Sequence, residues 1–327
     1  MATYKKDKGL NVKSYTTDPD KTYPSAFEGQ LYYNSSDGQF KYIGLGAGTW
    51  SSAPTLNTAR RYPGGAGIQK AALCIAGQSY PSFYDLTEEY NGTAWSEEGD
   101  LSTSRGRLAS GGTTTAAFAA AGNMGPPGNT DSAEKWNGSS WTSAGTINTA
   151  RGNIAGAGSN TAAVIFGGNP SPAYTEIYDG SSWSETGDLN TGRNALAGNG
   201  TSTAGWAGGG GSPGASTETF NGSSWTEGPS LNSGRSYLAG WGTTTSAVII
   251  GGAPPGTKCA LTESFDGTSW TETGDLGTAN KYLAAAGANN TAGIQIAGST
   301  GGPPDGTAVN TSEEFTVSHA FKKVTTG

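Results

Sequence analysis

The side chains that most often carry out catalysis are scarce in this sequence of 327 residues. It contains one histidine, His319, and two cysteines, Cys74 and Cys259. A metal site built from several histidines is therefore excluded, and the cysteines do not have the spacing of metal ligands. A Ser-His-Asp triad is not expected, because the one candidate base stands close to the C-terminus. We predict a protein that is not an enzyme, with no metal and no cofactor.

The most regular polar feature is that glutamate and arginine each recur along the chain at similar intervals, as an acidic and a basic series. Each glutamate precedes an aromatic residue by two positions, and the series is Glu88, Glu134, Glu176, Glu218, Glu263 and Glu313. The arginines are Arg60, Arg105, Arg151, Arg193 and Arg235, and Asn280 stands where a sixth is expected. Two interpretations are open. Each glutamate pairs with an arginine of its own or the next repeat and holds the repeats together, or the arginines form a ring that binds an anionic sugar or phosphate.

A tryptophan stands ten residues before each member of the basic series. These residues are Trp50, Trp95, Trp141, Trp183, Trp225 and Trp270, at intervals of 42 to 46 residues. An internal period of this length indicates a repeat architecture. Aromatic rings do stack on sugars, but one tryptophan at a fixed phase in every repeat favours packing between repeats. We therefore assign the tryptophans a structural role, as we do the glutamates.

Each repeat carries the signals of four short strands, which we name a, b, c and d. Strands a and b are rich in alanine and glycine, strand c carries the glutamate and the aromatic residue, and strand d begins near the tryptophan. Asn-Gly or Asp-Gly between c and d predicts a two-residue hairpin turn. Small residues on the inner strands and aromatic residues on the outer strands suit the blades of a propeller. Strand b ends at Gly77, Gly122, Gly168, Gly210, Gly252 and Gly298.

Composition limits the partners that the chain can have. Glycine accounts for 54 residues, charged residues for 14%, and the net charge is −7. A negatively charged chain has no basic field for a polyanion, so nucleic acid is not an expected partner. No stretch approaches the ~18 apolar residues of a membrane helix, and the N-terminus lacks the apolar core of a secretory signal. We expect synthesis in a cytoplasm and no membrane insertion.

The repeats resemble those of a Kelch-type β-propeller over about residues 29–327. The resemblance rests on glycine pairs such as Gly167-Gly168, the aromatic residue before the Asn/Asp-Gly turn, the tryptophan and the Leu-x-x-x-Arg step. It implies an all-β fold with six blades. The last repeat has no tryptophan after SEEF (312–315), and Trp50 has no glycine-rich strands before it. We therefore expect the Trp50 strand to complete the last blade, so that N- and C-terminal strands close the ring.

The N-terminal region carries a second resemblance. The segment FEGQLYYNSSDGQFKYIG and the Ser/Thr/Gly-rich body that follows it are similar to tail-fibre and appendage proteins of bacteriophages. Residues 29–50 alternate apolar and polar positions around Asp37-Gly38, which predicts a hairpin. Residues 1–28 are polar and aperiodic, and we interpret them as an arm that attaches the protein to other virion proteins. The resemblance implies a virion protein, present in multiple copies on a particle or as a homo-oligomer.

The strand directions predict two unlike faces of the propeller. The a–b and c–d turns are short and nearly identical, whereas the b–c loops on the other face differ in every repeat (78–86, 123–132, 169–174, 211–216, 253–261 and 299–311). A constant frame with variable loops is typical of a binding surface, although variation tolerated at a surface would give the same pattern. The apolar residues of these loops are Tyr80, Phe83, Tyr84, Met124 and Tyr174.

From these observations we predict a non-enzymatic structural protein of a phage virion. Its loop face would bind the host surface, in particular a polysaccharide. Two alternatives remain: a decoration or connector protein that binds another phage protein, and a cellular Kelch-type interaction module.

Overall fold

The computed structural model describes residues 12–18, 30–126, 128–169, 173–211, 214–254, 258–301 and 306–324. Over these ranges the secondary structure is all β, and none of these residues belongs to a helix long and apolar enough to span a membrane. The chain divides into two compact units, residues 1–48 with 317–327 and residues 49–316. The expected division was 1–28 and 29–327. The boundaries differ because the predicted hairpin and the C-terminal strand pack with one another in the smaller unit, where Gly46 lies against Ser318 and Ala320.

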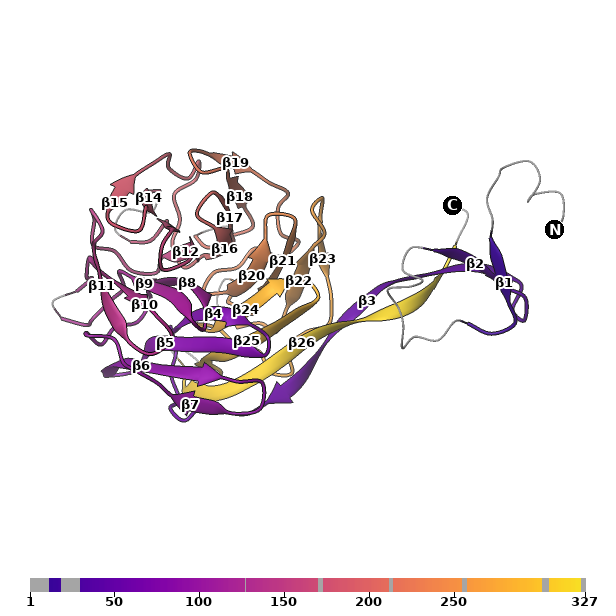
Figure 1. The fold of residues 1–327 in the computed structure, drawn as a ribbon, viewed down its shortest axis with the longest axis horizontal. Helices are drawn as coiled ribbons and strands as arrows, with labels where there is room; N and C mark the ends of the chain where they lie inside the picture. Colours follow the sequence, from indigo (N-terminus) through magenta and orange to yellow (C-terminus); the bar gives the residue numbers. More distant parts are fainter. Residues whose placement is uncertain are drawn as a thin grey trace. The chain divides into compact units, whose positions relative to one another are not determined.

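The larger unit contains six sheets arranged around a central axis, a propeller-like fold (Figure 1). We call the sheets blades 1 to 6. Blade 1 contains β4 (Gly64–Ile68), β5 (Ala71–Ser79), β6 (Ser82–Tyr90) and β7 (Trp95–Glu97). Blade 2 contains β8 (Ala109–Thr113), β9 (Ala116–Ala120), β10 (Ser132–Trp136) and β11 (Trp141–Thr146). Blade 3 contains β12 (Ala155–Gly158), β13 (Ala163–Phe166), β14 (Thr175–Tyr178) and β15 (Trp183–Glu185).

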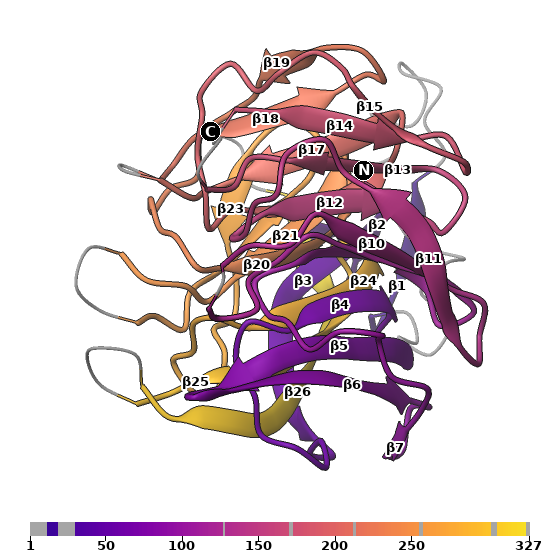
Figure 2. The same ribbon diagram turned by 90° about the vertical axis from the view of Figure 1, so that its left-hand side faces the viewer.

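The other three blades repeat this order. Blade 4 contains β16 (Ala197–Thr201), β17 (Ala204–Gly208), β18 (Thr217–Phe220) and β19 (Trp225–Glu227). Blade 5 contains β20 (Ala239–Thr243), β21 (Ser246–Ile250), β22 (Thr262–Phe265) and β23 (Trp270–Glu272). Blade 6 contains β24 (Ala284–Asn289), β25 (Ala292–Ser299), β26 (Ala308–Lys323) and β3 (Gln39–Ala53). Figure 2 shows the blade order from the axis outward in β4, β5, β6 and β7.

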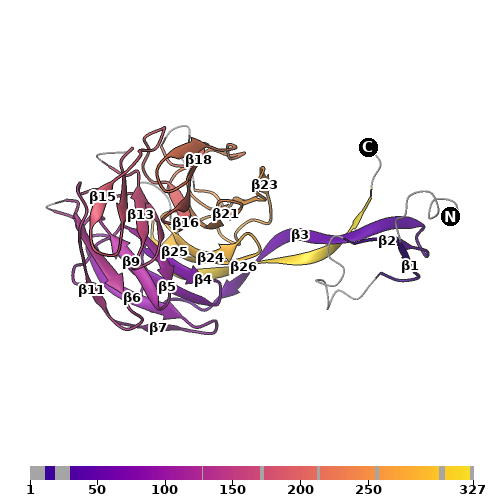
Figure 3. The same ribbon diagram turned by 45° about the horizontal axis from the view of Figure 1, so that its top comes forward.

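The inner strands close a ring. Each of β4, β8, β12, β16 and β20 contacts the next inner strand, and β24 contacts β4. Their small residues are required by this approach, because a Cβ on Gly65 would lie 2.5 Å from the carbonyl oxygen of Ala285, and one on Gly198 would lie 2.4 Å from the ring of Phe166. The oblique view in Figure 3 shows β6, β7 and β11 at the outer edge. The inner strands carry mainly small residues and the repeated aromatic residues of strands c and d lie farther out, as predicted, although Trp241 lies on the inner strand β20.

Terminal strands complete blade 6, as expected. β3 lies beside β26, and the ring of Trp50 lies 5.1 Å from that of Phe315. The same pairing of a strand c aromatic residue with the strand d tryptophan occurs in the five other blades, for example between Tyr178 and Trp183 at 5.0 Å. Trp50 thus occupies the strand d position of the last blade.

The turns between strands c and d differ from the prediction. They contain four residues, because Tyr90 pairs directly with Trp95 and Tyr178 with Trp183. The side-chain oxygen of Asp179 accepts hydrogen bonds from the backbone N–H groups of Ser181 and Ser182, and only the glycine that follows it has a positive φ. The Asp179 side chain thus acts as a hydrogen-bond acceptor for the backbone inside the turn, and an Asp-Gly dipeptide therefore also fits a turn of four residues. Two-residue turns occur instead between strands a and b, as at Thr114 and Thr115.

The smaller unit contains β1 (Lys13–Tyr15), β2 (Leu31–Asn34) and the outer parts of β3 and β26. The predicted hairpin is present, with residues 35–38 joining β2 to β3. Asp18 accepts hydrogen bonds from Tyr32, Asn34 and Lys41. Burial acts to raise the pKa of Asp18, but these hydrogen bonds outweigh it and leave the pKa below its usual value. Of the predicted arm, residues 1–11 and 19–28 lie outside the described residues.

Candidate functional site

The five arginines of the basic series each form an ion pair with the glutamate of their own blade. The N–O distances are 2.8 Å for Arg60 and Glu88, 2.9 Å for Arg105 and Glu134, 3.0 Å for Arg151 and Glu176, 2.7 Å for Arg193 and Glu218 and 2.5 Å for Arg235 and Glu263. The glutamates also accept backbone N–H groups from the segment that enters the blade, as Glu88 does from Asn57 at 2.7 Å. Each pair therefore fastens the d–a connection to strand c of the blade it enters.

The burial of these arginines argues against a role in ligand binding. They are 0 to 3% exposed, so their guanidinium groups cannot reach a ligand while the blades are folded. Burial also lowers the pKa of Arg105, and the carboxylate of Glu134 acts in the opposite direction. A buried cation without its carboxylate would be strongly destabilising. Of the two interpretations of the arginine series, the burial and the pairing favour structural ion pairs over a ring that binds a ligand.

Blade 6 lacks this pair. Asn280 takes the arginine position and donates to the carbonyl oxygen of Ala297 at 2.8 Å, while its own side-chain oxygen accepts the N–H of Ser299. Glu313 is half-buried and accepts the backbone N–H of Gly277 at 2.7 Å. The amide side chain thus replaces a charged contact with two neutral hydrogen bonds.

The tryptophans join neighbouring blades. The indole N–H of Trp141 in blade 2 donates to Thr87 of blade 1 at 2.9 Å. Trp225 of blade 4 donates in the same way to Thr175 of blade 3 at 3.0 Å. Trp95, Trp183 and Trp50 donate to backbone carbonyls of the preceding blades, and the ring of Trp270 lies 6.1 Å from that of Trp206 in blade 4. These contacts place the tryptophans between blades.

The glycines that end strand b are also inter-blade contacts. Their N–H groups donate to the carbonyl oxygen at the arginine position of the next blade, from Gly77 to Arg105 at 2.8 Å through to Gly298 and Arg60 at 2.9 Å. All six blades make this bond. The glycines have positive φ, as does the residue before each of them. The strand b glycine of one blade and the residue at the arginine position of the next blade are therefore in direct contact.

A belt of six residues surrounds the axis, and sequence analysis did not identify it. The members stand two residues after the basic series: Tyr62, Arg107, Asn153, Ala195, Tyr237 and Tyr282. Each backbone N–H donates to the carbonyl oxygen of the preceding member, from Arg107 to Tyr62 at 3.0 Å, and Tyr62 closes the cycle onto Tyr282 at 2.6 Å. All six have φ between 54 and 61°. The closed cycle holds non-glycine residues in a left-handed conformation that they rarely adopt.

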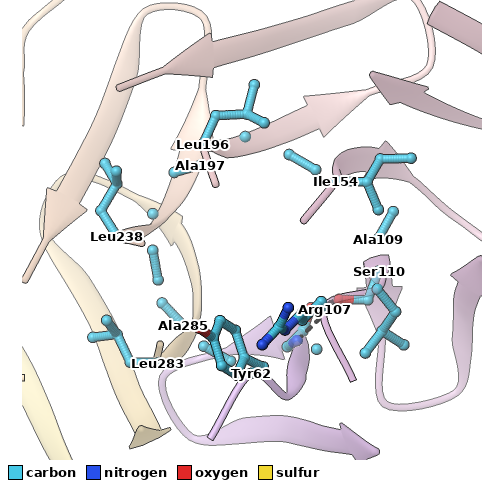
Figure 4. A pocket seen from close by; sticks show the side chains of 18 of the residues that line it. Tyr62, Arg107, Ala109, Ser110, Ile154, Leu196, Ala197, Leu238, Leu283 and Ala285 are labelled. Carbon is cyan, nitrogen blue, oxygen red and sulfur yellow. Dashed lines mark hydrogen bonds between the residues drawn. The ribbon is translucent and has the colours of Figure 1, made fainter. Parts of the chain in front are cut away.

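The belt stands at the mouth of an axial pocket of about 120 Å³. Besides the belt, the pocket is lined by leucine and isoleucine, including Ile154 and Leu196, and by small residues such as Ala197 and Ser110 (Figure 4). Apolar walls with a few polar groups at the opening are typical of ligand sites. Among the described residues that line the pocket, Arg107 is the one charged side chain.

Aromatic contacts organise one side of the belt. The rings of Tyr62 and Tyr282 are stacked with centroids 4.1 Å apart, and Tyr237 meets Tyr282 edge to face at 4.8 Å. The guanidinium carbon of Arg107 lies 4.4 Å from the centroid of Tyr62, and the ammonium nitrogen of Lys281 lies 4.6 Å from that of Tyr282. Burial raises the pKa of the Tyr62 hydroxyl, although Arg107 acts in the opposite direction. Tyr62 therefore remains a neutral hydrogen-bond donor at neutral pH.

The apolar residues predicted for the loop face have different environments. Tyr80 is 81% exposed and Tyr174 is 43% exposed, whereas Phe83, Tyr84 and Met124 are half-buried. Segment 78–86 is not a loop, because β5 and β6 continue to Ser79 and Ser82 and leave Tyr80 and Pro81 at the turn.

The b–c segments lie beside the belt. Arg61, next to Tyr62, forms a β-bridge with Gln78, and Gly106, next to Arg107, forms one with Asn123. Variable segments and the axial pocket therefore belong to one face of the larger unit.

The belt position could have been found in the sequence because the residue at this one place in the repeat differs from blade to blade. Between the arginine position and the leucine position three residues later, the second residue is tyrosine, arginine, asparagine or alanine. This position differs from blade to blade, whereas the arginine two residues earlier is kept in five of the six, and variable positions on a constant frame are where binding residues are often found.

The remaining candidate groups do not form a site. Cys74 is buried and its sulfur accepts a hydrogen bond from Arg60 at 3.2 Å, and burial raises the pKa of its thiol. Cys259 is half-buried and its thiol is free. Within the described ranges, histidine, cysteine, aspartate and glutamate side chains form no group that could hold a metal ion.

No family model matches the sequence, and the comparison with curated proteins gives no match either.

Proposed function

We propose that this chain is a non-enzymatic component of a phage virion, built on a six-bladed Kelch-type propeller, that binds polysaccharide on a host surface. The proposal rests on one observation, the contrast between the contacts that repeat in the propeller and the residues that vary on its loop face. Ion pairs, tryptophans and glycine contacts recur around the ring, whereas the b–c segments and the belt differ from blade to blade. Repeated contacts stabilise a scaffold, and differing residues beside a pocket supply recognition.

Exposed aromatic residues support recognition on this face. Tyr80 stands at the tip of the β5–β6 hairpin and is 81% exposed. An exposed tyrosine contributes a large contact area at little conformational cost, and its hydroxyl can hydrogen-bond to a sugar. Because a fold alone does not imply a function, these side chains are what favour a binding protein.

The smaller unit supports attachment to other virion proteins or to further copies of this chain. It exposes apolar side chains at Leu31, Phe40 and Val324. The rings of Tyr33 and Phe40 lie 5.1 Å apart on neighbouring strands. Exposed apolar groups that lie together are typical of protein contacts. This observation favours the second candidate, a decoration or connector protein, if the propeller binds no cell.

The test is binding of the fluorescently labelled protein to a panel of bacterial cells, with purified surface polysaccharides as competitors. We expect saturable binding that is competed by one polysaccharide and weakened in Tyr80→Ser. The matched control is Ile68→Ser, since Ile68 is 48% exposed in the same blade but stands by the a–b turn. Absence of binding to every cell would refute host recognition. Equal weakening by both variants would show that the loop face has no special role.

A further inference from the structure

The axial pocket contains a positive charge that the scaffold does not use. The Arg107 guanidinium forms no ion pair with the carboxylates of the described residues, and its buried Nε has no hydrogen-bond partner among them. This differs from Arg105, two residues earlier, which pairs with Glu134 at 2.9 Å. The chain has a net charge of −7, yet no acidic side chain of the described residues lines the pocket. The opening therefore attracts anions on an otherwise acidic protein.

The guanidinium is held in place before any ligand arrives. Tyr62 lies between Tyr282 and Arg107 in the belt and contacts both, at 4.1 and 4.4 Å. The hydrogen-bonded cycle fixes the backbone of all three residues. A planar guanidinium resting on a ring retains its N–H edge for bidentate contact with a carboxylate. Preorganisation of this kind lowers the entropy lost on binding.

The opposite side of the belt is open. Asn153 and Ala195 stand across from the tyrosines, and their side chains are the short members of the belt. The pocket volume of about 120 Å³ is well above the ~10–15 Å³ that one water needs on the same measure. It therefore admits a carboxylate and the atoms that adjoin it.

We propose that the axial pocket binds the carboxylate of an acidic saccharide, with Arg107 as its anion-binding residue. This inference rests on the proposed function, which makes a surface polysaccharide the ligand. Tyr237 and Asn153 border the same opening and add hydrogen-bonding groups for sugar hydroxyls, while Tyr62 and Tyr282 are positioning residues for the guanidinium.

The experiment is a titration of the full chain, followed by NMR or calorimetry, with methyl glucuronide, methyl glucoside and an N-acetylated dipeptide that has a free C-terminal carboxylate. We expect methyl glucuronide to bind at least about tenfold more tightly than methyl glucoside, because the latter lacks the charge-assisted contact. Binding should weaken with added salt. Arg107→Gln should lose about tenfold or more for the glucuronide and little for the glucoside.

Two further variants keep the test independent of folding. Lys70→Gln removes the same charge from an exposed a–b turn of blade 1 and should leave binding unchanged. Ala195→Tyr places a residue that three other blades carry at this position with a similar φ, so it should fold and block the opening while leaving Arg107 intact. Thermal melting checks that all variants remain folded.

Defined outcomes would overturn the inference. These are equal binding of glucuronide and glucoside, unchanged glucuronide binding by Arg107→Gln, or no glucuronide binding by the native protein. Binding of the dipeptide in place of the glucuronide would refute the saccharide and assign the pocket to protein C-termini. Glucuronide binding without binding to any cell would support the pocket and refute host recognition, whereas cell binding unchanged in Arg107→Gln would do the reverse.

Discussion

Removal of one partner from a buried ion pair gives a sharp test of how the blades are held together. In Arg105→Met the side-chain volume is largely retained, but Glu134 loses the guanidinium 2.9 Å away. The carboxylate keeps its hydrogen bond from the backbone N–H of Ser102 at 3.0 Å. Because both side chains are almost fully buried, the unpaired carboxylate should destabilise the protein by about 3–5 kcal/mol.

This free energy corresponds to a measurable change in melting temperature. For a body of this size a loss of 1 kcal/mol lowers the midpoint by about 2 °C, so we expect a decrease of about 6–10 °C. The assay is thermal and urea unfolding followed by tryptophan fluorescence. The matched control is Arg107→Met, because Arg107 is half-buried and forms no ion pair with the described residues. Its loss should be about 1 kcal/mol or less.

The double variant Arg105→Met with Glu134→Gln separates the charge from the packing. A neutral amide at position 134 can still accept the N–H of Ser102, and no charge is left buried. We expect the double variant to recover most of the stability lost in Arg105→Met, because replacing both members of a buried pair is often nearly neutral. A single variant as stable as the native protein, or a double variant less stable than the single, would refute the reasoning.

Three further predictions concern other parts of the frame. Gly122→Ala should lower the free energy of unfolding by about 2–3 kcal/mol, because φ is +113° and the new Cβ would lie 2.8 Å from the carbonyl oxygen of Gly106. The control is Gly145→Ala, which has a φ of +76° and nothing within 4 Å of the new Cβ, and which should lower it by about 1 kcal/mol. Trp225→Phe should cost about 2 kcal/mol through loss of the 3.0 Å bond to Thr175, and a double-mutant cycle with Thr175→Val that shows no coupling would contradict this. Hydrogen bonds from the Ser181 and Thr268 side chains and from backbone N–H groups lower the pKa of Asp179 and Asp266 from 3.8 to about 2. Their contribution is therefore complete above about pH 4 and is lost as the pH falls through 2, so unfolding midpoints of Asp179→Asn with Asp266→Asn should depend less on pH between 4 and 2 than those of the native protein.

Much of the frame could be predicted because its contacts recur at one phase. The strand b glycine makes the same contact in all six blades, and the strand c glutamate pairs with an arginine in five of them. Each tryptophan packs against the preceding blade, so spacing alone reveals the period. The position of Trp50 follows from the same logic, since the repeat before it is incomplete and the last one lacks a tryptophan. Pairing of β3 with β26 then gives the last blade the fourth strand that the other blades have.

Turn types could not be predicted from the same pattern. Asn-Gly and Asp-Gly fit a two-residue turn, but they also fit the four-residue turns observed here, in which the side chain of Asn91 accepts the backbone N–H groups of Thr93 and Ala94. Both geometries place glycine at a positive φ. The choice depends on the pairing of Tyr90 with Trp95 across the hairpin, where the two rings stack 5.1 Å apart, and the dipeptide alone does not specify this pairing.

Sequence analysis did not identify the belt for a related reason. Its left-handed conformation is imposed by hydrogen bonds between blades and not by the local preference of tyrosine or arginine. The backbone alone makes these bonds, so no particular side chain is required in every blade. This freedom explains why one series contains residues as different as Arg107 and Ala195.

Residues that break the repeat are therefore the ones that can define a ligand. Arg105 and Arg107 show the distinction within one blade: the first has counterparts in four other blades, each opposite a glutamate, and the second has none. A charge that is repeated and paired stabilises the ring, whereas the single charge of Arg107 at the axis, next to the tyrosine stack, makes one side of the opening different from the others. Recognition of an asymmetric ligand by a ring of similar blades requires such a difference, and Arg107 supplies it together with Ala195 on the open side.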